Sequence, residues 1–354
     1  MAVTCLGWWQ VERLGGEAMN SEPGPKVALR PEAAEAVLSL ARGDFACGRE
    51  EAQTPVAGAG ENRRAAEALV SLLLTHSTTE RAMTVVGLSP EEMRAALLRL
   101  ASGETVGHPK LSLDRVRDGV DRLEGYVRHV TTDLGWIDHA ANLALRYVPW
   151  RGELRGEIWI EFTALGAELY DGGAWLLGSV AHVMLDLFHL DNEKDLVKVC
   201  AHEYNHAAVY LYRYDPSRRV GWLENCPPPV AQILDLLYLE GLARFTTQDR
   251  RYRPDIGHCF EVVQQALDAA KAGSTLPGTD LWTGDAGQGH LGGTAGAFIF
   301  ETILTGTDQT EWGAAVRGGP EGVLTRYDFL ASAKGLPRLR LCFPLPLLGY
   351  PMRQ

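Results

Sequence analysis

Hydrophobic residues recur at helical spacing through the first part of the chain, from Pro31 to about Tyr147. This period of three to four residues is typical of helices that bury one face. The clearest helix start is Ser89-Pro90-Glu91-Glu92, because Ser89 can cap the helix and Glu92 can complete a capping box. The pattern predicts helices over 31–40, 63–75, 89–101, 112–132 and 134–147.

The pattern changes after Pro149. Ile158, Ile160 and Phe162 alternate with larger polar or amphipathic residues, which is the period of a strand. Gly172-Gly173 is predicted to form a turn, and the apolar run over 180–188 is short enough for a buried strand. Later helices are predicted over 193–212, 229–246, 255–272 and 294–304. These elements predict an α+β fold that is mostly helical, with a short mixed or antiparallel sheet.

Composition shifts suggest four regions. Residues 1–28 are rich in glycine and proline and are predicted to be a disordered tail. Residues 29–150 form an N-terminal helical region, and 151–335 form the region that carries the chemistry. Residues 336–354 are a proline-rich segment that we expect to pack against the surface.

Charge and cysteine usage restrict the partners and the compartment. The net charge of −11 argues against nucleic acid or an anionic membrane as the main partner. The longest apolar run, 174–190, contains His182, Asp186 and His189 and is too polar to span a bilayer. The six cysteines form no C-x-x-C pair, and no secretory signal is present, so we expect a soluble cytoplasmic protein. The oligomeric state stays open.

The residues most informative about chemistry are His202-Glu203-Tyr204-Asn205-His206, an H-E-x-x-H pattern inside a predicted helix. Histidines four positions apart lie one above the other on the same helical face, so both imidazoles can bind one metal ion. The intervening glutamate lies at the edge of that face, where it can act on water. This is the arrangement of metallopeptidases.

A hydrolytic zinc site needs a third protein ligand. A third histidine in the same segment is excluded, because Val209 and Tyr212 occupy the positions where the motif would continue with Gly and His. Two acids remain. Glu224 lies in a predicted loop, whereas Glu240 lies in the predicted helix 229–246, and rigid elements hold a site better than loops. Gly241 would let this helix approach the first one closely.

The combination of His202–His206 with Glu240-Gly241-Leu242-Ala243 resembles the gluzincin metallopeptidases. Within that clan it is most similar to the predicted zinc-dependent proteases that carry H-E-Y-x-H and a later E-G-L-A. The resemblance covers roughly residues 157–304. It implies a zincin-like core in which His202, His206 and Glu240 hold Zn²⁺ and Glu203 is the general base.

The chain departs from the gluzincin pattern at Arg244, where many members place an acid that orients a ligand histidine. Asp186, Asp235 or a backbone carbonyl would then have that role. The resemblance also implies a donor to the developing oxyanion. Three residues are candidates for it, with His290 first because it opens the predicted helix 294–304: His290, Tyr252 and His258.

Three functions compete at this point. The first is a zinc peptidase that hydrolyses peptide or protein substrates. The second is a zinc protein of the same fold that is inactive on peptides and acts as a binding module. The third is a helical interaction protein in which the H-E-x-x-H pattern is incidental. The second binds metal without cleaving peptides, and the third does neither.

Overall fold

The computed structural model describes residues 25–43, 59–168, 171–190, 192–213, 226–247, 255–273 and 291–341. Contacts divide the chain into two compact units. Apart from the residues that precede Pro25, the first unit comprises Pro25–Ala140 and Gly156–Glu203, and the second comprises Ala141–Arg155 and Tyr204–Gln354. The strands and the beginning of the metal-motif helix thus group with the N-terminal helices in this division by contacts.

The first unit contains the sheet and most of the N-terminal helices. Its elements are β1 (Lys26–Arg30), α1 (Glu32–Arg42), α2 (Ala59–Leu74), α3 (Ser77–Val86), α4 (Pro90–Ala101), α5 (Leu113–Asp118), α6 (Val120–Thr132), the first part of α7 (Gly135–Ala144), β2 (Glu157–Thr163), β3 (Gly172–Leu177), β4 (Val180–Asp186) and the first part of α8 (Glu193–Arg213).

The second unit is helical. It holds the ends of α7 and α8 and the following elements: the 3-10 turn η1 (Arg151–Glu153), α9 (Pro228–Thr247), α10 (Ile256–Lys271), α11 (Leu291–Gly306), α12 (Gln309–Arg317) and α13 (Gly319–Lys334). Helices α12 and α13 were not predicted from the sequence.

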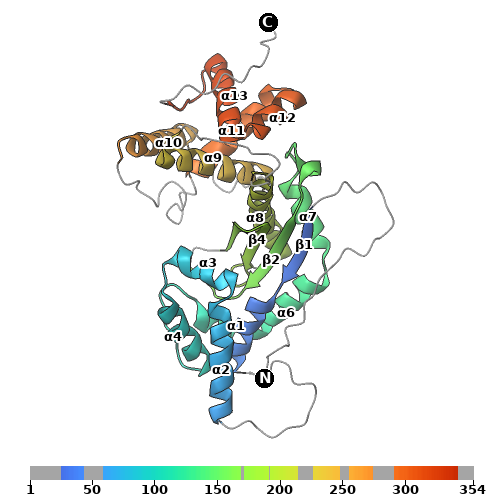
Figure 1. Cartoon of the computed structure of the whole chain (residues 1–354), viewed down its shortest axis with the longest axis vertical. Helices are drawn as coiled ribbons and strands as arrows, with labels where there is room; N and C mark the ends of the chain where they lie inside the picture. Colours follow the sequence, from blue (N-terminus) through green and yellow to red (C-terminus); the bar gives the residue numbers. More distant parts are fainter. Residues whose placement is uncertain are drawn as a thin grey trace, which may run out of the picture. The chain divides into compact units, whose positions relative to one another are not determined.

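The sheet has the order β1-β2-β4-β3, and β1, β2 and β4 run side by side in Figure 1. Strand β2 pairs in parallel with β1 and β4, whereas β3 pairs antiparallel with β4 and lies at an edge. A small mixed sheet in a mostly helical chain confirms the predicted α+β class. The strand predicted from Ile158, Ile160 and Phe162 is confirmed, and these three side chains are fully buried.

The opposite face of β2 differs from a simple polar face. Glu161 and His182 are both 2% exposed, and His182 Nδ1 lies 3.0 Å from Glu161 Oε2. Ser77, at the start of α3, donates to Glu161 Oε1 at 3.0 Å. Burial of a carboxylate requires such partners. Helix α3, which was not predicted, supplies one of them.

Local signals at helix ends are confirmed. Ser89 Oγ accepts from Glu92 N at 3.1 Å, and Ser89 N donates to Glu92 Oε2 at 2.8 Å, which is the predicted capping box of α4. Helix α1 ends at Gly43, whose φ of 73° is in the left-handed region that favours glycine.

Three sequence predictions were wrong in detail. The single helix over 112–132 is two helices, because Gly119, with φ −105° and ψ 15°, interrupts the helical backbone between α5 and α6. Gly172 and Gly173 begin strand β3 and do not form a turn. The predicted tail 1–28 ends too late, since β1 begins at Lys26 and pairs with Glu157. A five-residue strand is too short for periodicity to detect.

In the second unit, α9 and α11 cross where glycines meet. A Cβ on Gly241 would lie 2.6 Å from the Cα of Gly296, and a Cβ on Gly296 would overlap the carbonyl oxygen of Leu237. Side chains at either position would push the helices apart. The close approach that Gly241 permits is therefore to α11, and the prediction that it serves the approach to the metal-motif helix was wrong.

Around this crossing the second unit is packed with aromatic residues. The ring of Phe300 on α11 lies 5.5 Å from Tyr238 and 6.3 Å from Phe245, centroid to centroid, and 6.0 Å from Trp312 of α12. Trp312 Nε1 donates to the carbonyl of Tyr147 at 2.9 Å. Helices α9, α11 and α12 therefore share one core with the segment that follows α7.

Among the described residues, no helix is long and apolar enough to cross a membrane. Cys200 and Cys259 are buried free thiols. The cytoplasmic location stays a prediction.

We expect Gly296→Ala to lower the free energy of unfolding by about 3 kcal/mol, because its new methyl group meets backbone that cannot move aside. The matched control is Gly125→Ala, in the exposed part of α6, where a Cβ meets nothing within 4 Å. That change should stabilise the protein slightly, by up to about 1 kcal/mol. Urea denaturation of both variants measures the difference, and equal midpoints would contradict the close crossing.

Candidate metal centre

Helix α8 runs without interruption from Glu193 to Arg213 and carries the H-E-x-x-H pattern in its second half. Acidic residues in its first turn and Arg213 in its last turn interact favourably with the helix dipole and so stabilise the helix. The motif lies in a mostly buried stretch, where His206 is 6% and Glu203 9% exposed and His202 is half-buried. The predicted helix over 193–212 is confirmed.

Three predicted ligands come together. His202, His206 and Glu240 each offer one ligand atom, and these atoms lie within 4.8 Å of one another. His206 Nε2 is 3.4 Å from Glu240 Oε1. Two ligands bonded to a tetrahedral zinc at 2.0–2.1 Å would be about 3.3 Å apart. A direct charge-assisted hydrogen bond would be shorter, at about 2.7–2.9 Å. The spacing therefore fits two donors that share one ion.

An ion pair ties α8 to the helix that carries Glu240. Arg213 Nη1 donates to both carboxylate oxygens of Asp235 at 2.6 Å, and both side chains are largely buried. Asp235 precedes Glu240 by five residues on α9, so the pair holds α9 near the end of α8. Truncation of either partner would leave a largely buried charge, which is costly.

A second anchor comes from within the motif. Asn205 is fully buried, and its Nδ2 donates to the carbonyl of Ala144 at 2.8 Å. Ala144 is the last residue of α7, and a carbonyl at a helix end needs such a donor. This bond fixes the rotation of α8 about its axis from Asn205 on, and so fixes the direction in which His206 points.

Helix α11 supports the side chain of Glu240. A Cβ on Gly293 would lie 3.3 Å from the Cβ of Glu240 and 2.7 Å from both Cδ and Nε of Arg244. Glycine at 293 therefore leaves the space in which these two side chains run. Arg244, where the gluzincin pattern places an acid, packs its stem against α11 at this glycine.

Glu203 lies next to the edge strand of the first unit. A Cβ on Gly172 would lie 3.1 Å from Cγ of Glu203 and 2.8 Å from Cγ1 of Val199. The first residue of β3 must therefore be a glycine if α8 is to pack this closely on the strand. Packing against α8 therefore requires glycine at position 172, a role that the predicted turn did not include.

Cys200, two positions before His202, is not a nucleophile. It is fully buried, and burial raises the pKa of its thiol far above the ordinary value, with a smaller contribution from the charge of Glu203. The thiolate is the reactive form of cysteine. Cys200 is therefore not a candidate for the chemistry of this helix.

Most of the other predicted site residues cannot be placed relative to this grouping. Glu224, Tyr252 and His290 lie outside the described residues. His258 is exposed in the first turn of α10. Its neighbour Cys259 is buried, and burial raises the pKa of that thiol to about 11.

The two acids predicted to orient a ligand histidine have other partners. Asp186 is fully buried and accepts the backbone N–H groups of Ala167 and Phe188, at 3.1 and 3.2 Å. Burial raises the pKa of its carboxyl group. Asp235 pairs with Arg213. These contacts give both acids structural roles and lend no support to the predicted one.

No family model, curated protein or solved structure matches the chain. The resemblance to gluzincins therefore rests on the two short motifs, and the evidence for a metal site rests on the geometry of its three donors.

We expect the purified protein to bind one zinc ion per chain. His206→Ala should lower zinc affinity by more than about a hundredfold, because it removes a direct ligand. The control is His129→Ala, an exposed histidine on α6, which should bind zinc as the unmodified protein does. Competition with a fluorescent chelator measures both. Equal affinities would remove His206 from the site.

Proposed function

We propose that this protein is a zinc-dependent peptidase with a zincin-like core. The observation that supports this most directly is the grouping of His202, His206 and Glu240, with His206 Nε2 and Glu240 Oε1 at the separation of two zinc ligands. Two helices reach this grouping from motifs 34 residues apart in the sequence. An incidental H-E-x-x-H pattern would not require a third donor at that place.

The donor set favours zinc over magnesium and calcium. Two imidazoles and one carboxylate suit zinc, whereas magnesium and calcium prefer oxygen ligands alone. Three protein ligands leave a fourth tetrahedral position, which is the feature that separates hydrolytic from structural zinc sites. A zinc ion held by these three residues would polarise the scissile carbonyl of a substrate. It would also lower the pKa of a water molecule at the fourth position to near neutrality.

Glu203 is the general base in this proposal. It follows His202 directly, so its carboxylate lies at the edge of the face that carries both histidines. In hydrolysis it takes a proton from the attacking water, whose oxygen bonds to the carbonyl carbon. It then returns the proton to the amide nitrogen as the C–N bond breaks. Gly172 of β3 lies against Cγ of Glu203 and limits its rotamers.

The edge strand supports an extended peptide as the substrate. Within the described part of the chain, strand β3 is paired on one side only, with β4, and it begins at the glycine that contacts Glu203. An extended peptide can pair with the N–H and C=O groups of such an edge. A substrate held along β3 would pass beside the general base, which a small-molecule hydrolase would not need.

We expect Glu203→Gln to lower kcat/KM for peptide hydrolysis by about 10²–10⁴-fold, because glutamine cannot accept the proton. Zinc content should stay at one per chain. The control is Glu193→Gln in the exposed first turn of the same helix. Digestion of a peptide library, read by mass spectrometry, compares the three proteins. Zinc binding without cleavage by any of them would favour an inactive binding module, and equal cleavage by all would remove Glu203 from the mechanism.

A second prediction separates the two acids that compete for the third ligand position. Glu240→Ala should weaken zinc binding far more than Glu224→Ala, because Glu240 already lies 3.4 Å from His206. Isothermal titration of zinc into both variants measures the difference. The reverse order would show that the wrong acid was chosen while the zinc site itself remained.

A further inference from the structure

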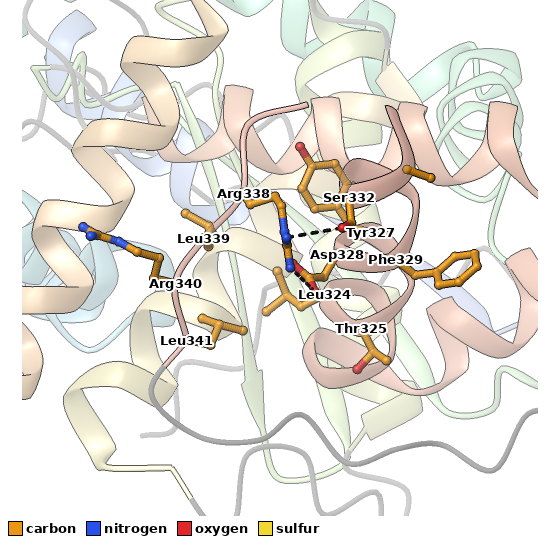
Figure 2. A pocket seen from close by; sticks show the side chains of 11 residues that line it. Leu324, Thr325, Tyr327, Asp328, Phe329, Ser332, Arg338, Leu339, Arg340 and Leu341 are labelled. Carbon is orange, nitrogen blue, oxygen red and sulfur yellow. Dashed lines mark hydrogen bonds and ion pairs between the residues drawn. The ribbon is translucent and has the colours of Figure 1, made fainter. Parts of the chain in front are cut away.

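A groove of about 1020 Å³ lies in the second unit (Figure 2). One wall is helix α13 and the other is the extended segment 336–341 that follows it. Leu324 and Tyr327 of α13 and Leu339 and Leu341 of the extended segment line it. No residue of the candidate metal centre contributes to this lining.

The walls of the groove are fixed by specific bonds. Gly335, with φ 63°, ends α13 and turns the chain back along the helix. Tyr327 then donates its hydroxyl to the carbonyl of Pro337 at 2.6 Å. Arg338 donates to both oxygens of Asp328 at 2.7 and 2.8 Å, a pairing that Figure 2 shows across the groove. A cavity held by these bonds exists before any occupant arrives.

The lining is partly open to water and mixed in character: apolar side chains alternate with the polar or charged Thr325, Asp328, Ser332, Arg338 and Arg340. Phe329 is 54% exposed, which is unusual for a phenylalanine, and Ser332 and Ala333 beside it are exposed. Arg338 and Asp328 neutralise each other. The apolar side chains of the groove can therefore receive an uncharged apolar segment, and exposed apolar patches mark binding surfaces.

The sequence itself supplies such a segment. It continues beyond the lining residue Leu341 with Cys342-Phe343-Pro344-Leu345-Pro346-Leu347-Leu348-Gly349-Tyr350-Pro351. These residues lie outside the described part of the chain. They contain no charge, and alternating prolines favour an extended conformation that costs little entropy to order. Proline-rich segments of this type bind grooves lined by aromatic side chains.

We infer that residues 343–350 of this chain bind in the groove along α13. Because Leu341 is itself part of the lining, the tether is short and the effective concentration is in the millimolar range. Even a weak intrinsic affinity would then favour the bound state over binding to another molecule. Helix α13 packs on α9 and α11, the helices that carry Glu240 and Gly293.

Self-competition tests this inference. A labelled synthetic peptide of residues 342–354 is titrated into the full chain and into a chain that ends at Leu341. The shortened chain should bind the peptide at least about tenfold more tightly, because the full chain already occupies the groove with its own segment. A peptide with Phe343, Leu345 and Leu347 replaced by serine is the matched control and should not bind. Equal binding by both chains, or no binding by a folded shortened chain, overturns the inference.

A second measurement keeps the full length and does not depend on the shortened chain folding. The groove variant Ala333→Cys is alkylated with and without the three serine substitutions, and mass spectrometry reads the rate at position 333. The serine substitutions should accelerate alkylation several-fold by opening the groove. Equal rates overturn the inference. Protection that falls on dilution also overturns it, because the occupant would then be a second copy.

Discussion

The candidate metal centre depends on the contact between α9 and α11 at Gly241 and Gly296. Glu240 can remain 3.4 Å from His206 only if the backbone of α9 is held in place, and no side chain separates the two helices at this crossing. Gly293, one turn before Gly296 on α11, leaves room for the side chains of Glu240 and Arg244. These glycines therefore determine the direction of the Glu240 side chain, although none of them is itself a candidate ligand.

The geometry around His206 is determined from several directions. Asn205 holds the carbonyl of Ala144, and Arg213 holds the carboxylate of Asp235. One bond fixes the rotation of the second half of α8, and the other fixes the distance to α9. A site that is preorganised in this way binds its ion without having to assemble the ligands first, which favours affinity. It also explains why a polar residue such as Asn205 is fully buried inside the motif.

Much of this arrangement could be predicted from the sequence. The spacing of His202 and His206, the capping box at Ser89 and the alternation around Ile160 are local signals, and each corresponds to the structure. The choice of Glu240 over Glu224 followed from placing it on a helix. Strand β1 and the role of Gly172 could not be predicted, because they depend on partners far away in the sequence. The ion pair of Arg213 with Asp235 could not be predicted either, because a single sequence does not show which charged residues are buried.

The buried thiol of Cys200 has a consequence for how the protein would respond to reagents. Iodoacetamide and related alkylating agents attack thiolates, and this sulfur is neither ionised nor accessible. Cysteine-directed reagents and mild oxidants should therefore spare helix α8. If His202, His206 and Glu240 hold a metal ion, chelators such as phenanthroline would act at α8 where thiol reagents do not.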